Sequence, residues 1–234
     1  MGETLCFDIE TNGLLSVEEP KIHCIATINI DTEEEKLYNP SEVYEGLKAL
    51  YYADMIIGHN ICGFDIPFIE MMYPRFHCNP WDTLVASRML YPDRKGRAPH
   101  SIESWGSIWG LEKIENEDWS VYTDLMGTRC LVDTRIGLKI YRRFINRMSG
   151  HDWERAMNLE MAIVRRHVKQ VVAGVDIDVP HAKATVARLD EELEFISSSL
   201  VSLIPMKCKQ VGATVRKPFI KAGGFSAIVK RWFE

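Results

Sequence analysis

The stretch CFDIETNG, residues 6–13, places two acidic residues two positions apart in a segment that we predict to be a β-strand. Because side chains alternate along a strand, Asp8 and Glu10 point to one side of it, while Phe7 and Ile9 point to the other. Two neighbouring carboxylates repel each other unless a cation, a proton or water compensates their charge. The pattern therefore indicates either a solvated strand face, which is common for charged residues, or part of a cation-binding site.

The segments that follow predict a mixed sheet. Period-two and buried apolar patterns predict strands over residues 3–9, 21–30, 36–38 and 55–59. Helical patterns begin near Ser41, at Asp65, after Asp82 and at Thr128, and the last of these helices extends to Met148. Three antiparallel strands, followed by helices that alternate with further strands, indicate an α/β fold in which helices flank a mixed sheet.

Length and composition narrow the classes of protein. With 234 residues and 46% hydrophobic content, the chain can form one domain of about 150 residues with an appendage. Six cysteines occur without a C-x-x-C pair, which favours reduced thiols over disulfides or a zinc site. The sequence contains neither an apolar stretch of membrane-spanning length nor a signal-like N-terminus, so we expect a cytoplasmic protein without a membrane contact.

Beyond Gly150 the pattern becomes purely helical. One amphipathic helix should end at Gly174, and a second should begin at Pro180. In the second helix, apolar residues alternate in steps of four and three: Ala182, Val186, Leu189, Leu193, Ile196, Leu200 and Leu203. This heptad seam predicts a helical hairpin packed on itself or on the body, with a docking surface for another polypeptide as the alternative.

The last segment is basic although the whole chain has a net charge of −5. Seven basic residues follow Pro205, with Glu234 as the sole acid: Lys207, Lys209, Arg216, Lys217, Lys221, Lys230 and Arg231. The segment could contact phosphates or an acidic partner, or it could be a solvated tail. We divide the chain into a domain over residues 1–150, a helical extension over 151–204 and a basic tail over 205–234.

Two further acids come from distant segments. Asp65 follows a predicted buried strand, and Asp133 lies early in the long predicted helix. Together with Asp8 and Glu10, they are the set that a two-metal centre for phosphodiester hydrolysis requires, because Mg²⁺ prefers oxygen ligands. Each has an ordinary alternative, since Asp65 could cap its helix and Asp133 could lie on a solvated helix face.

Five motifs resemble a known family in their order along the chain. They are FDIETNGL (7–14), IIGHNICGFDIPFI (56–69), WDTLVASRML (81–90), PHSIESWG (99–106) and RCLVDTRIGLKIY (129–141). The chain over residues 1–148 resembles the 3′–5′ proofreading exonuclease domain of bacteriophage family A DNA polymerases, within the ribonuclease-H-like DEDD exonucleases. A weaker likeness over residues 162–193 is to the helical entry of the polymerase domain.

The resemblance implies a site, a cofactor and a substrate. Asp8, Glu10, Asp65 and Asp133 match the four family acids and would hold two Mg²⁺ or Mn²⁺ ions. The implied reaction removes nucleotide monophosphates from a DNA 3′ end. By the same likeness Asn12 and Leu14 would meet the terminal nucleotide, and Asn60 would steady the strand, although Asn60 also suits a turn. We expect His59 to be structural.

Arg129 departs from the family pattern. The family carries tyrosine or histidine four residues before the last aspartate, and arginine cannot act as a general base. One helical turn from Asp133, Arg129 could form an ion pair that competes with a metal ion. The hypotheses are an active site in which Arg129 clamps a phosphate, or a site that binds DNA ends and cleaves poorly.

The sequence ends before any polymerase motif, which leaves three functional hypotheses. The first is the exonuclease part of a split phage polymerase in the cytoplasm of the infected host. It would join a separate polymerase chain through residues 180–204 and the tail. The alternative explanation of its length is an artificially truncated polypeptide. The second is a degenerate subunit that binds DNA ends or scaffolds a polymerase. The third is an RNA-directed exonuclease of the same superfamily.

Overall fold

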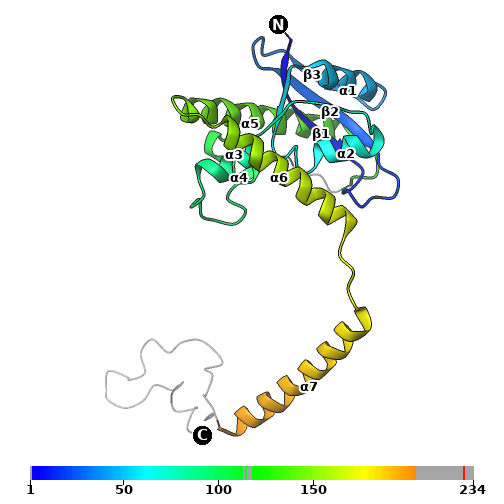
Figure 1. The fold of residues 1–234 in the computed structure, drawn as a ribbon, viewed down its shortest axis with the longest axis vertical. Helices are drawn as coiled ribbons and strands as arrows, with labels where there is room; N and C mark the ends of the chain where they lie inside the picture. Colours follow the sequence, from blue (N-terminus) through cyan, green and yellow to red (C-terminus); the bar gives the residue numbers. More distant parts are fainter. Residues whose placement is uncertain (1, 113, 115–117, 204–228, 230–234) are drawn as a thin grey trace. The chain divides into compact units, whose positions relative to one another are not determined.

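The computed structural model describes residues 2–112, 114, 118–203 and 229. The chain divides into two compact units, Met1–Val175 and Asp176–Glu234. The first unit contains a five-stranded sheet with helices around it (Figure 1). This is the mixed, helix-flanked α/β architecture that the sequence predicts.

The sheet has the strand order β3-β2-β1-β4-β5. Its strands are β1 (Thr4–Thr11), β2 (Ile22–Asn29), β3 (Glu35–Tyr38), β4 (Met55–Gly58) and β5 (Pro80–Asp82). The first three pair antiparallel, and β4 is parallel to both β1 and β5. The four predicted strands are confirmed, and each of their ends lies within two residues of the predicted position. The edge strand β5 was not predicted, because three residues beginning with proline are too short to show a period.

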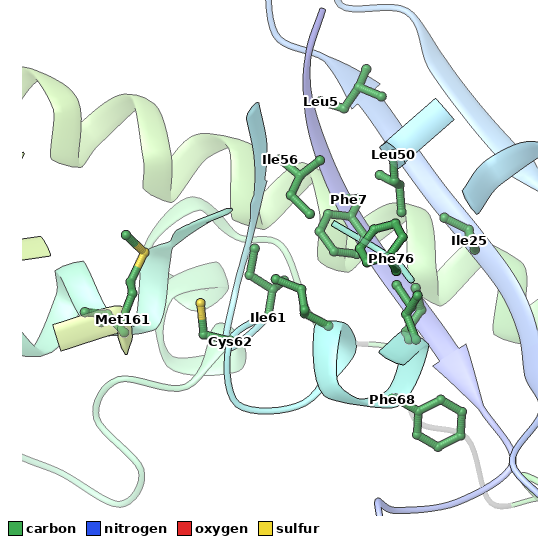
Figure 2. Close-up of a cluster of buried hydrophobic side chains, with 14 of the residues drawn as sticks. Leu5, Phe7, Ile25, Leu50, Ile56, Ile61, Cys62, Phe68, Phe76 and Met161 are labelled. Carbon is green, nitrogen blue, oxygen red and sulfur yellow. The ribbon is translucent and has the colours of Figure 1, made fainter. Parts of the chain in front are cut away.

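The two faces of β1 have different surroundings. Phe7 and Ile9 belong to the main core, together with residues of α1 (Val43–Tyr52) and α2 (Asp65–Met72). Figure 2 shows Leu5 and Phe7 on β1 beside Leu50 of α1. Cys6, on the opposite face, packs with Leu138 of the long helix α5 (Asp124–Met148). By strand alternation the acidic side chains of β1 therefore face α5, as the sequence pattern requires.

Aromatic packing fixes α5 against the shorter helices α3 (Thr83–Leu90) and α4 (Ile102–Gly106). Trp105 is buried, with its ring centroid 5.1 Å from that of Phe144 and 5.6 Å from that of Tyr91. A short turn of helix, Ser107–Trp109, follows α4. α5 begins four residues before the predicted start, because the Thr123 side chain accepts a hydrogen bond from the Met126 N–H and caps the helix there.

The two predicted C-terminal helices are present as α6 (Glu154–Ala173) and α7 (Val179–Leu203). α6 contacts α3 and buries Met157 and Met161 in the main core. It ends at Gly174, whose φ of 74° suits a residue without a Cβ. α7 belongs to the second unit, so its pairing with α6 as a hairpin stays a prediction, as do the predicted domain boundaries.

The sequence also led to expectations about the basic tail, the cysteines and membrane-spanning helices. The basic tail over residues 205–234 lies outside the described residues apart from position 229. Cys6, Cys24, Cys62, Cys78 and Cys130 are free thiols. Among the helices that the structure describes, none combines the length and apolar character that crossing a bilayer demands.

Candidate active site

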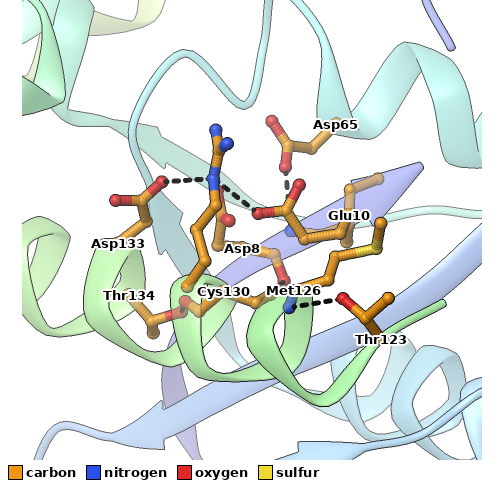
Figure 3. Close-up of polar contacts among 10 residues, drawn as sticks. Asp8, Glu10, Asp65, Thr123, Met126, Cys130, Asp133 and Thr134 are labelled. Carbon is orange, nitrogen blue, oxygen red and sulfur yellow. Dashed lines mark hydrogen bonds and ion pairs between the residues drawn. The ribbon is translucent and has the colours of Figure 1, made fainter. Parts of the chain in front are cut away.

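Three of the four predicted acids converge between β1 and α5. Asp8 and Glu10 project from β1, and Asp133 projects from the third turn of α5 toward them (Figure 3). One carboxylate oxygen from each lies within 4.8 Å of the others. Glu10 and Asp133 are each only 5% exposed. The solvated alternatives for the β1 face and for Asp133 therefore do not describe these side chains.

The fourth acid, Asp65, lies at the first residue of α2 and reaches back to β1. Its Oδ1 accepts a hydrogen bond of 3.3 Å from the backbone N–H of Ile9 (Figure 3). The approach of the preceding strand to β1 is close, because a Cβ at Gly58 would stand 2.8 Å from the Phe7 carbonyl oxygen. A glycine at the end of β4 therefore lets the chain turn directly beside the acid pair.

Burial raises the pKa of the Asp65 carboxyl from 3.8 to about 7. Loss of hydration is the largest cause, the hydrogen bonds from backbone N–H groups oppose it, and the charges of Asp82 and Glu10 raise the pKa further. A nearby cation would favour the charged form of Asp65, so the high pKa belongs to the metal-free protein.

This pKa predicts a pH dependence of stability without metal. Between the unfolded pKa near 4 and the folded pKa of about 7, the folded chain holds more protons, so raising the pH destabilises it. We expect ionisation of Asp65 to lower the free energy of unfolding by roughly 2–3 kcal/mol from pH 5 to pH 8. Denaturant titrations in EDTA should show a flatter profile for Asp65→Asn, and identical profiles would contradict the prediction.

Arg129 lies among the carboxylates rather than in solvent. Its Nε is 3.1 Å from Glu10 Oε1 and 3.8 Å from Asp133 Oδ2 (Figure 3). Its guanidinium carbon is 4.6 Å from the ring centroid of Trp119, a cation–π distance. The sequence predicted the contact with Asp133 from helical spacing, but it could not reveal Glu10 or Trp119 as partners, because those contacts join separate segments.

All eight predicted site residues line one cleft of about 880 Å³. Leu14 is 72% exposed there, and Asn12 uses its side chain to bind the Glu19 carbonyl and the Lys21 N–H at 2.8 Å each. Asn12 therefore shapes the loop that carries Leu14. Asn60 has a φ of 65°, and its carbonyl accepts hydrogen bonds from two following N–H groups, which is the turn geometry considered for it.

Sequence reasoning missed the second role of Asp82. Its side chain caps α3, the helix that the sequence predicts to begin after Asp82, by accepting hydrogen bonds from Leu84 and Val85 N–H. It also accepts hydrogen bonds from the backbone N–H groups of Asn60 (3.0 Å) and Cys62 (2.9 Å). One buried carboxylate thus ties the Asn60 turn to α3. Only the capping role leaves a local sequence signal.

Arg88 and His100 also line the cleft, and neither was predicted as a site residue. His100 Nδ1 is 2.8 Å from Ser87 Oγ, and that oxygen accepts a hydrogen bond from Trp105 Nε1. His59 lines the cleft too, with Nδ1 2.8 Å from Thr83 Oγ1, in agreement with a structural role.

The residues present suit a divalent cation. Three carboxylates from two elements offer oxygen atoms close enough to share an ion, and hard cations such as Mg²⁺ and Mn²⁺ prefer such ligands. Asp65 borders the same cleft and would complete the acidic set. Arg129 is the feature that such a cation would have to accommodate.

The fold and the acidic cleft agree with a family that the whole domain matches. The model of the ribonuclease H superfamily matches residues 5–159, and the chain belongs to that superfamily. Comparison with curated proteins gives no match. The family assignment is coarser than the resemblance found in the sequence, since it does not distinguish phage polymerase domains from other members.

Solved structures show the same fold. NrnC of Brucella melitensis bound to pGG superposes with a TM-score of 0.56 at 14% identity, covering 76% of this chain and 91% of that one. The same protein with bound Mg²⁺ gives 0.55 at 13% identity over the same shares. RNase D of Escherichia coli, an exoribonuclease involved in structured RNA processing, gives 0.53 at 15% identity, covering 71% and 45%.

Proposed function

We propose that this protein is a divalent-metal-dependent 3′–5′ exonuclease that releases nucleotide monophosphates. The observation that carries the proposal is the meeting of Asp8, Glu10 and Asp133 within 4.8 Å, in a cleft that Asp65 also lines. Membership of the ribonuclease H superfamily supports it. So does the Mg²⁺ named for the NrnC structure.

The division of roles follows from the geometry. Asp8, Glu10 and Asp133 would hold the metal, and Asp65 would complete the set for two ions. Bound divalent ions would acidify water, a role that Arg129 cannot take over as a general base, and would stabilise charge on phosphate oxygens. Leu14 would offer its exposed apolar side chain to the terminal base, and Asn60 lines the same cleft.

DNA is the substrate that we propose first, because the motif order resembles proofreading domains. In this view the protein edits 3′ ends during phage DNA replication in the cytoplasm of the infected host. RNA is a second candidate, favoured by the fold neighbours: NrnC was solved with pGG, and RNase D is named an exoribonuclease.

The experiment uses single strands of identical sequence made of DNA or RNA, each labelled at the 5′ end. The proposal predicts a ladder of products shortened from the 3′ end with Mg²⁺ or Mn²⁺ and none in EDTA. Faster cleavage of DNA than of RNA would support DNA as the substrate. Faster cleavage of mismatched than of matched primer ends, measured on primer–template duplexes, would support proofreading. Preference for RNA would replace that substrate, and absence of metal-dependent cleavage on both strands would refute the exonuclease.

Arg129 gives a specific reason to test a degenerate subunit as well. An arginine already paired with Glu10 and Asp133 could leave a site that holds strand ends without cutting them. Arg129→Tyr restores the residue type usual in the resembling family. A large gain in cleavage would mean that the native site is handicapped, and no gain would mean that arginine does not limit it.

We also propose that α7 binds a separately encoded polymerase chain. The heptad seam is exposed in the structure, with Leu189, Leu193 and Ile196 each at least half exposed. Such a seam stabilises helix association when a partner covers it. A polymerase fragment without an exonuclease domain should retain the wild-type protein and lose Leu193→Glu, with the seam-distant Arg188→Glu as control. Equal retention of both variants, or none of the wild type, would contradict this partner.

A further inference from the structure

The position of Arg129 has a consequence for metal binding. Its Nε approaches Glu10 Oε1 at 3.1 Å and Asp133 Oδ2 at 3.8 Å, and the side chain is 13% exposed. Both acids belong to the trio whose oxygens lie within 4.8 Å. The arginine therefore compensates the same carboxylates that would ligate a divalent ion.

A guanidinium and a divalent ion cannot share these oxygens without cost. Two cations a few ångströms apart repel each other, and the repulsion is strong where burial excludes water. Glu10 and Asp133 are buried, so screening there is weak. Metal binding should therefore require Arg129 to withdraw from at least one acid.

The cleft offers Arg129 another anion when substrate is present. Arg129 lines the cleft together with the acids, and a strand end brings phosphate groups into it. Guanidinium groups bind phosphate through paired hydrogen bonds, which an arginine on a helix can form after a change of rotamer. The guanidinium packs on the face of the Trp119 ring. Trp119 is uncharged, so Arg129 would not have to break an ion pair with it in order to move.

Resting on the proposed function, we propose that Arg129 is a counter-ion switch that couples strand binding to metal binding. Without substrate, Arg129 neutralises Glu10 and Asp133 and weakens metal binding. A 3′ end draws the guanidinium onto a phosphate and frees both carboxylates for the ion. Because coupling free energies are reciprocal, metal binding in turn tightens the strand.

The test measures Mn²⁺ affinity by electron paramagnetic resonance, with and without a short DNA strand that carries non-hydrolysable linkages. For the wild type we expect the strand to raise Mn²⁺ affinity about tenfold, within the usual range of coupling. For Arg129→Gln we expect Mn²⁺ affinity without DNA to rise about tenfold and the effect of the strand to vanish. Arg129→Lys keeps the positive charge and should retain weak Mn²⁺ binding. Comparison with Arg129→Gln therefore separates the effect of the charge from a folding defect caused by replacing the arginine.

Controls separate this inference from the proposed function. Arg142→Gln removes an α5 cation that pairs with Glu33 and does not line the cleft, and it should leave the strand's effect on Mn²⁺ intact. If Arg129→Gln binds Mn²⁺ as the wild type does while Asp8→Asn abolishes binding, the switch is wrong and the metal site stands. If Asp8→Asn leaves Mn²⁺ binding unchanged, the metal site itself is refuted and the switch with it.

Discussion

Replacement of Asp8 by asparagine should lower the rate of nucleotide release at least about 1000-fold, which corresponds to about 4 kcal/mol of transition-state stabilisation. The substitution keeps the shape of the side chain and removes the charge that would bind a divalent ion. Asp8 belongs to the trio of carboxylates, so its neutralisation affects an ion held jointly with Glu10 and Asp133. The measurement is the initial rate of 3′ shortening at saturating Mg²⁺.

Asp31→Asn is the matched control, because Asp31 is an exposed acid in the turn after β2. It should cleave at the wild-type rate. If Asp8→Asn kept more than a tenth of the wild-type rate while remaining folded, the acid trio would not be the catalytic centre.

Replacement of Asp82 by alanine should lower the free energy of unfolding by about 3–5 kcal/mol. The carboxylate is fully buried and accepts four backbone hydrogen bonds, from the N–H groups of Asn60, Cys62, Leu84 and Val85. Alanine leaves those donors without this acceptor, and unpaired buried polar groups are costly. Urea denaturation of both proteins at pH 7.5 measures the difference.

Asp93→Ala is the control for this substitution, since Asp93 is an exposed residue of the loop after α3. We expect it to change stability by less than about 0.5 kcal/mol. A loss below about 1 kcal/mol for Asp82→Ala would show that the turn at Asn60 does not depend on the buried carboxylate.

The sequence predicted those parts of the fold whose signals are local. Alternation of side chains identified β1 and oriented its acids, and the helical pattern identified α5, whose buried residues include Ile136 and Phe144. The edge strand β5 was missed because its three residues are defined by pairing with β4. The start of α5 was misplaced because the Thr123 cap lies outside the apolar pattern.

The candidate site likewise contains residues that a local sequence pattern predicts and contacts that no local pattern predicts. Acid spacing and motif order identified the four carboxylates, and helical spacing linked Arg129 to Asp133. The contacts of Arg129 with Glu10 and Trp119 arise only when β1, α5 and the segment before α5 meet. The bond from Asp82 to the Asn60 turn likewise spans 22 residues, so no local pattern could disclose it.

The central claim is that these acids bind divalent ions at one place. A crystal grown with Mn²⁺ and measured at the manganese absorption edge tests it directly. We predict an anomalous peak bounded by the carboxylates of Asp8, Glu10 and Asp133, with the Arg129 guanidinium moved off at least one of them. A map with no peak there, and with Arg129 still bound to both Glu10 and Asp133, would contradict the account.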